Sequence, residues 1–297
     1  MQKQNGEKLI QAARVDPIED MIMDWKRTHL MKCLRISILC LLAAGLLSAS
    51  LRVQNNMRSH LYIPGTSLIV ISIGSTSRQD LLQVQAAKLG KYVTIHPFSE
   101  VNVPKCFVCN HTHEGETHPD GLIGRSHESH SWWCAQKRPL LAAYEVLKHA
   151  KQLPDFLLVI DDDTFVNPVA LSKFVMDSQE LVGKPAYVGH LGSPRMVMGG
   201  GGTVITRAVL DAWKHGGDAR PWAPLKWCIE QTQGGNWCHW HSDWAYGLCV
   251  HKWSGANATD MQHIFNQNRE PCTPQHVACH NRVDVKDWID TWDRNVG

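Results

Sequence analysis

Two observations predict an α/β fold with a Rossmann-like, mostly parallel sheet for most of this chain of 297 residues. Fully apolar, β-branched runs such as Ser67–Ile73 (SLIVISI) and Phe156–Ile160 (FLLVI) are typical of strands buried on both faces. Helical patterns, of which Pro139–Gln152 is the clearest, stand between such runs, and this alternation favours a parallel sheet covered by helices. A third observation, an apolar segment near the N-terminus, predicts a single transmembrane helix in front of this domain.

The elements follow one another in a regular order. Pro139 suits the first position of a helix, and the Pro154-Asp155 pair stops that helix before the FLLVI strand begins. Three weaker strands are expected at Tyr92–His96, Ala186–Gly189 and Thr203–Thr206. The other helices are expected at Gln79–Leu89, Val169–Met176, Arg207–Lys214 and Ser242–Lys252.

Composition excludes several classes of protein. The chain is 43% hydrophobic and 20% charged, which is too apolar for an intrinsically disordered protein. The formal net charge of +2 gives no electrostatic reason to expect nucleic acid as a partner. We therefore expect a globular protein with one sizeable core and no nucleic-acid partner.

The apolar segment Cys33–Leu51 is long enough to cross a bilayer, which takes about 20 residues. An uncleaved signal anchor is favoured over a buried core helix and over a signal peptide, because signal peptides normally start close to the N-terminus. More basic residues precede the segment than follow it, which keeps the N-terminus in the cytosol. We expect a type II protein with a cytosolic tail at 1–32, the anchor at 33–51, a stem at 52–66 and a lumenal domain at 67–297.

Two further features agree with a lumenal domain. Asn110 and Asn257 each begin an N-glycosylation sequon. Beyond the anchor, an even number of cysteines indicates up to four disulfides whose pairing stays open, at positions 106, 109, 134, 228, 238, 249, 272 and 279. The segment 106–134 is also rich in histidine, and there disulfides with a solvated loop are favoured over a structural zinc site.

Three adjacent carboxylates, Asp161, Asp162 and Asp163, follow the FLLVI strand directly. Ligands of open α/β sheets bind beyond the carboxyl ends of the strands, and such a carboxylate cluster repels itself unless a cation neutralises it. Hard oxygen ligands suit Mg²⁺ or Mn²⁺, which often complete their shell with substrate phosphates. The alternative is a solvated turn that caps the next helix, but the position after a buried strand favours a metal and nucleotide site.

Two other segments contribute candidate residues. Gly199–Gly202 permits a close approach of backbone to a ligand, although a flexible loop explains it equally well. Asp243 lies between Trp240 and Trp244, whose rings offer flat faces to a sugar or pack in the core.

Together, FLLVIDDDTFVNP, GGGGTVITRAVL and HSDWAYGLCV resemble the Fringe-like glycosyltransferases, the group that includes fringe and the core 1 β-1,3-galactosyltransferases. The resemblance covers most of Ser67–His280, and the type II topology fits it. It implies a GT-A catalytic domain in the Golgi or endoplasmic reticulum membrane.

The resemblance also implies a metal site. Asp163 matches the family's Mn²⁺ ligand, and Asp161 belongs to the same metal and nucleotide-sugar motif. His280, in the segment ACHNR, matches the histidine that completes the metal shell, with His276 and His263 as the alternatives.

The donor and the base are assigned in the same way. The resemblance places Asp162, Arg78, Gly200 and Gly201 at the nucleotide sugar. It implies that Asp243 is the catalytic base. Trp240 and Trp244, on either side of it, are the candidates for stacking on the acceptor sugar.

The chemistry of transfer agrees with these roles. A nucleotide diphosphate leaves more easily when a divalent ion neutralises its charge, and the acceptor hydroxyl needs a base to take its proton. We expect an inverting β-1,3-glycosyltransferase that uses Mn²⁺ or Mg²⁺, a UDP-sugar donor and a glycoprotein O-glycan acceptor. Galactose transfer to O-linked N-acetylgalactosamine is favoured, and N-acetylglucosamine transfer to O-fucose is the alternative.

Two other classes of function are carried as alternatives. His239, His241 and Asp243 have the HxHxD spacing of zinc metallo-hydrolases. A membrane-anchored, non-catalytic glycan-binding relative is the second alternative. The oligomeric state, including a homodimer, stays open.

Overall fold

The computed structural model describes residues 66–75, 78–99, 137–216, 220–238, 240–268, 271–280 and 284–296, all within one compact unit, Met57–Gly297. The predicted tail, anchor and stem, apart from Thr66, lie outside the described residues, as do Asn110, His239 and the cysteines at 106, 109 and 134. None of the helices in the described ranges has the length and apolar character that crossing a bilayer requires.

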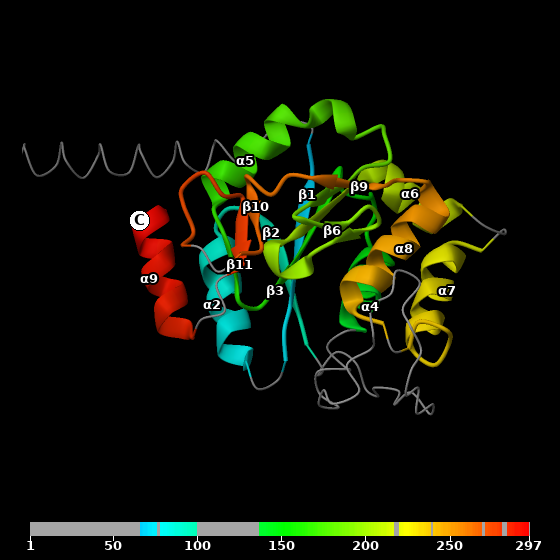
Figure 1. Cartoon of the computed structure of the whole chain (residues 1–297), viewed down its shortest axis with the longest axis horizontal. Coiled ribbons are helices and arrows are strands. Elements are labelled where there is room, and N and C mark those ends of the chain that lie inside the picture. The colour runs from blue at the N-terminus through cyan, green and yellow to red at the C-terminus, as the bar shows by residue number, and fades with distance from the viewer. Residues whose placement is uncertain are drawn as a thin grey trace, which may run out of the picture. The chain divides into compact units, whose positions relative to one another are not determined.

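A mixed sheet of mostly parallel strands forms the centre of the domain, so the predicted α/β class is confirmed (Figure 1). Its strand order is β2-β1-β3-β8-β5-β9. β1 is parallel to both β2 and β3, and β5 is parallel to β9, whereas β8 is antiparallel to both of its neighbours. The bounds are β1 Leu68–Ile73, β2 Thr94–Phe98, β3 Phe156–Asp161, β5 Tyr187–Gly189, β8 Thr203–Thr206 and β9 Ala258–Asp260.

Helices cover both faces of this sheet (Figure 1). Side chains alternate along β3, so Leu157 and Val159 join the core on one face while Phe156, Leu158 and Ile160 join the core on the other. The first face packs against α4 Arg138–Leu147, α6 Arg207–His215, α7 Ala223–Thr232 and α8 Ser242–Ser254. The second face packs against α2 Gln79–Leu89, α5 Pro168–Asp177 and α9 Val285–Asn295.

Smaller elements extend the carboxyl end of β3. A three-stranded sheet has the order β10-β11-β4, with bounds β10 Phe265–Asn266, β11 Ala278–His280 and β4 Thr164–Val166. β11 is antiparallel to β4, and this register places His280 opposite Thr164. The remaining elements are β6 Leu191–Ser193, β7 Met196–Val197 and the 3-10 turns η3 Gln179–Leu181 and η4 Gly199–Gly201.

The predicted strand at Tyr92–His96 and the predicted helix at Pro139–Gln152 differ most from the structure at their ends. β2 starts at Thr94 instead of Tyr92, because the backbone N–H groups of Tyr92 and Val93 both bond to the carbonyl of Leu89 and close the end of α2. The predicted helix to Gln152 ends at Leu147, after which the chain makes a turn. The predicted helix at Gln79–Leu89 and the strand at Thr203–Thr206 have the expected bounds.

Asn167 fixes the start of α5, directly after β4. Its Oδ1 accepts hydrogen bonds from the backbone N–H groups of Val169 (2.9 Å) and Ala170 (3.3 Å), and its Nδ2 donates to the carbonyl of Pro274 (3.0 Å). We expect Asn167→Ala to lower the free energy of unfolding by about 1–2 kcal/mol, since it removes a cap and a buried bond. Asn167→Asp keeps the capping oxygen and should cost less. Urea denaturation of both variants checks this, and equal losses would contradict the capping role.

Candidate functional site

The three aspartates lie where β3 ends. Asp161 is the last residue of β3 and is paired in register with Ile73 of the parallel strand β1. Asp162 and Asp163 form the turn into β4, whose first residue is Thr164. The Thr164 hydroxyl accepts a bond from the backbone N–H of Asp161 (3.1 Å) and donates to the carbonyl of Gly200 (2.9 Å). This hydroxyl therefore ties the acidic turn to the glycine loop.

A buried glutamine on α2 holds the backbone of the acidic turn. Gln85 is 1% exposed, and its Nε2 lies within bonding distance of the carbonyls of Asp161 (3.1 Å), Asp162 (2.8 Å) and Thr164 (2.8 Å). The hydroxyl of Ser72, on β1, donates to the Gln85 Oε1. The sequence analysis missed Gln85, although a polar residue among the apolar positions of a helix was a visible signal.

Two basic side chains, Arg78 and His280, face the carboxylates. The Arg78 Nη1 lies 3.2 Å from an oxygen of Asp162 and 3.1 Å from an oxygen of Asp163. The His280 Nε2 lies 3.3 Å from the other oxygen of Asp163. Of the three candidate histidines, His280 is therefore at the acidic turn, whereas the His276 Nδ1 accepts a bond from the N–H of Thr273.

Burial perturbs the three carboxyl groups differently. Burial raises the pKa of Asp161 well above its usual value, and the charges of Asp163 and Asp243 raise it further. Burial also raises the pKa of Asp162 to about 6 against the opposing charge of Arg78. Burial pushes the pKa of Asp163 upward too, but the hydrogen bond and charge of His280, together with Arg78, outweigh it and lower that pKa. The cluster thus concentrates negative charge in a buried place, which favours cation binding.

The glycine loop, η4 Gly199–Gly201, packs tightly against two other candidate residues. A Cβ atom on Gly199 would lie 2.7 Å from an oxygen of Asp243. A Cβ atom on Gly200 would lie 2.8 Å from the Gln267 Oε1 and 2.9 Å from the His280 Nδ1. A side chain at either position would displace these atoms, so the two glycines leave space for Asp243 and His280 beside the loop.

Asp243 lies in the first turn of α8 and reaches the same region. Burial raises its pKa, while bonds from the backbone N–H of Gly199 and the hydroxyl of Ser242 (3.2 Å) act in the opposite direction. Asp243 and Asp161 both line a small cavity of about 20 Å³, together with Tyr246. The two carboxyl groups that the sequence analysis placed in different roles therefore border one cavity.

For the remaining predicted residues, the structure gives their exposure and packing. Trp244 is 3% exposed and its ring is inside the fold, whereas Trp240 is partly exposed and stacks on Trp237 with centroids 5.6 Å apart. Asn257 is exposed, as a glycosylation acceptor requires. His263 is exposed as well.

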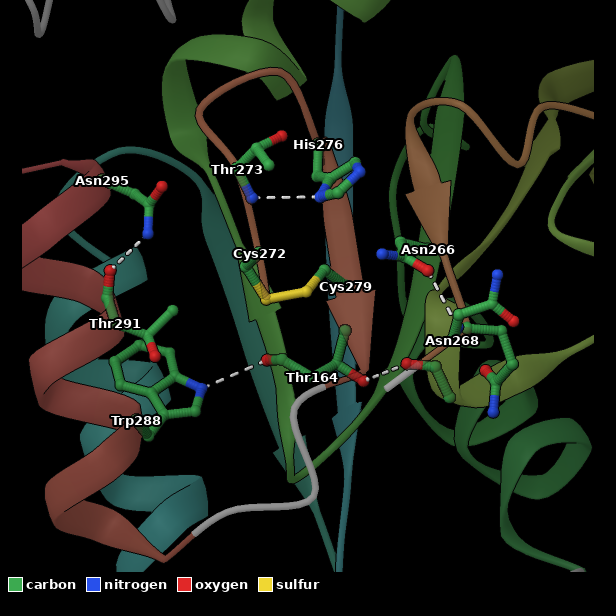
Figure 2. Close-up of a disulfide and its surroundings, with 12 residues drawn as sticks. Thr164, Asn266, Asn268, Cys272, Thr273, His276, Cys279, Trp288, Thr291 and Asn295 are labelled. Carbon is green, nitrogen blue, oxygen red and sulfur yellow. Dashed lines mark hydrogen bonds between the residues drawn. A yellow bond between two sulfur atoms is a disulfide. The ribbon is translucent and has the colours of Figure 1, made fainter. Parts of the chain in front are cut away.

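Two disulfides fasten the elements that carry Asp243 and His280. Cys228–Cys249 joins α7 to α8, and Cys272–Cys279 joins the segment after β10 to β11. Figure 2 shows the second disulfide beside Thr164, whose carbonyl accepts a bond from the Trp288 Nε1 (3.2 Å).

Removal of the Cys228–Cys249 disulfide is expected to destabilise the domain. Its cysteines are 21 residues apart, and closing a loop of this length in the unfolded chain contributes about 3 kcal/mol. Thermal unfolding of the Cys228→Ala/Cys249→Ala double variant tests this. The Cys272→Ala/Cys279→Ala variant, with a separation of 7, serves as the comparison and should lose less. An unchanged melting temperature in the first variant would contradict the prediction.

Comparison with protein-family models gives no match for this chain, and no curated protein matches it either. The family resemblance therefore depends on the motifs and on where the fold places them. In the described ranges, no three histidine, cysteine, aspartate or glutamate side chains are already gathered as a metal site.

Proposed function

We propose that the chain is a metal-dependent, inverting glycosyltransferase of GT-A architecture that moves a hexose from a UDP-sugar to an O-linked glycan. The observation that carries the proposal is the convergence of four separate segments at the carboxyl end of β3. The acidic turn, the glycine loop, Asp243 and His280 are far apart in the sequence, yet each lies in contact with another member of the set. Ligands of open α/β sheets bind at this end of the strands.

The residues present fit a divalent cation. Asp161, Asp163 and His280 would hold it, because two carboxylates and an imidazole are suitable ligands for Mn²⁺. The raised pKa of Asp161 supports this choice. Burial and the neighbouring negative charges disfavour the ionised carboxylate, and a bound cation would offset both. When bound, the ion neutralises charge on the departing diphosphate.

Arg78 and Asp162 are proposed to bind the nucleotide. The Arg78 guanidinium is already at the acidic turn and is 36% exposed, so it can also reach an anionic ligand. The backbone of Gly200 and Gly201 is proposed to border the donor, because the Gly200 carbonyl is bonded to Thr164 beside the acidic turn.

Asp243 is proposed to take the proton of the acceptor hydroxyl. A base works best when its pKa is close to the working pH, and burial moves the pKa of Asp243 in that direction. A single displacement by the acceptor oxygen inverts the anomeric centre, so an α-linked donor gives a β-linkage. The partly exposed Trp240 is the better placed of the two tryptophans for stacking on an acceptor sugar.

We also propose that the domain is lumenal, behind a signal anchor at 33–51, in the Golgi or endoplasmic reticulum. The two disulfides between described residues and an exposed sequon at Asn257 support an oxidising, glycosylating compartment.

The test is donor hydrolysis and transfer by the purified protein. UDP-galactose, UDP-N-acetylglucosamine and UDP-glucose are each supplied with Mn²⁺ or with a chelator, on O-linked N-acetylgalactosamine and O-fucose acceptors. We expect Mn²⁺-dependent turnover of UDP-galactose on the first acceptor. Turnover of UDP-N-acetylglucosamine on O-fucose would favour the fringe-type alternative. Folded protein that binds UDP and Mn²⁺ without turnover would favour the non-catalytic relative, and zinc-dependent hydrolysis would favour the metallo-hydrolase.

A further inference from the structure

A buried amide oxygen without a partner lies at the candidate metal site. Among the described residues, three buried side-chain polar atoms have no hydrogen-bond partner: Tyr246 Oη, Trp253 Nε1 and Gln267 Oε1. The Gln267 Nε2, by contrast, is 3.0 Å from the His280 Nδ1. Leaving a buried acceptor without a donor is unfavourable, so this oxygen needs an explanation.

The surroundings of Gln267 hold its amide against His280. The residue follows β10, and its backbone N–H bonds to the His190 Nδ1 (3.4 Å). The amide group packs on Gly200, where a Cβ atom would lie 2.8 Å from the Oε1 and 3.0 Å from the Nε2. Because the oxygen and nitrogen of an amide are nearly equal in size, a half-turn of the group exchanges them within the same space.

The two orientations select different tautomers of His280. When the Gln267 Nε2 faces the ring, it donates to the Nδ1, so the proton of the neutral ring is on the Nε2. That Nε2 then donates to Asp163, 3.3 Å away, and has no lone pair for a metal. When the Oε1 faces the ring, it accepts a hydrogen bond from the Nδ1–H. The neutral ring then has its proton on the Nδ1 and a lone pair on the Nε2. A metal-binding histidine usually donates its other N–H to such an acceptor.

We propose that Gln267 is a positioning residue whose amide turns to accept a hydrogen bond from the His280 Nδ1–H and so prepares the Nε2 to bind a divalent cation. The inference rests on the proposed function in one respect, the role of His280 as a ligand. It gives the oxygen without a partner a hydrogen bond from the Nδ1–H when the cation displaces the contact between the Nε2 and Asp163. It also gives Gly200 a reason to lack a side chain, because the amide turns against it.

The first test is Mn²⁺ affinity, measured by titration calorimetry and by the electron paramagnetic resonance signal of free Mn²⁺. Gln267→Met has a similar length but no acceptor, and we expect its affinity to fall about 10- to 100-fold. Gln267→Glu keeps an acceptor and should bind at least as tightly as the wild type. Thermal melting establishes that both variants fold. Equal affinity of Gln267→Met and the wild type would overturn the inference while leaving the proposed function intact.

A second measurement requires no metal. Nitrogen-15 NMR of His280, assigned with His280→Gln, reports which ring nitrogen carries the proton. We expect a proton on the Nε2 alone in the metal-free wild type and a proton on the Nδ1 in Gln267→Glu, whose carboxylate only accepts. An identical tautomer in both would refute the coupling between Gln267 and the ring. Failure of the wild type to bind Mn²⁺ would instead overturn the proposed metal site, and the cation role of Gln267 with it.

Discussion

Asp163→Asn is expected to lower kcat/KM for sugar transfer about a thousandfold, which corresponds to roughly 4 kcal/mol of transition-state stabilisation. Asp163 lies between Arg78 and His280, and its pKa is lowered, so it carries a full negative charge at neutral pH. The neutral amide removes that charge from the proposed metal site. Steady-state transfer with UDP-galactose and Mn²⁺ measures the effect.

A matched control distinguishes the specific effect of replacing Asp163 from the general effect of replacing an aspartate. Asp177 is 61% exposed and pairs with Lys173 on the surface of α5, so Asp177→Asn should change neither activity nor stability appreciably. The fold of Asp163→Asn should persist, because Arg78 keeps Asp162 as a partner. Full activity of Asp163→Asn with saturating Mn²⁺ would exclude Asp163 as a ligand.

Asp243→Asn is expected to lower kcat by about 10²- to 10⁴-fold, the usual contribution of a general base, while the affinity for UDP and Mn²⁺ stays unchanged. The Asn oxygen can still accept the bonds that Gly199 and Ser242 give to Asp243. The variant also removes a charge that burial disfavours, so its melting temperature should equal or exceed that of the wild type. Loss of donor binding, or a large loss of stability, would point to a structural role instead.

The pH profile gives an independent check on the same residue. Because the pKa of Asp243 is raised, the base becomes protonated at a higher pH than an ordinary aspartate, and the acid limb of kcat should shift upward accordingly. Ser242→Ala removes a bond that favours the charged carboxylate, so it should shift this limb further upward. An acid limb that is identical in wild type and Ser242→Ala would argue against Asp243 as the titrating base.

Strong local patterns account for what the sequence predicts well. The runs that became β1 and β3 are continuous and mostly apolar, and Gly90 ends the helix at Gln79–Leu89, so the sequence indicates where these elements lie. The direction of β8 could not be predicted in this way, because the sequence of a single strand does not indicate whether it runs parallel or antiparallel to its neighbours. The helix α9 was missed, although Trp288 and Trp292 have the i, i+4 spacing of a buried helical face.

The residues of the candidate site also differ in how well the sequence predicts them. Asp161–Asp163 and the glycine loop stand out as motifs, and the fold brings both to the end of β3. Gln267 does not stand out, because it acts on a residue that is distant in the sequence, and Gln85 shows only its place on the apolar face of a helix, not the carbonyls that it binds. The contact of Gly199 with Asp243 was equally hidden, since it depends on how α8 packs.

The contacts of Gln85 make the acidic turn sensitive to chemical ageing of the protein. One Nε2 faces three carbonyls, so the geometry of the turn depends on a single amide that can hydrolyse. Deamidation would replace its N–H donors with a second carboxylate oxygen and place a new negative charge beside Asp161 and Asp162. Gln85 is only 1% exposed, which keeps water away from its amide. The same burial that places the amide at the acidic turn therefore also slows its hydrolysis.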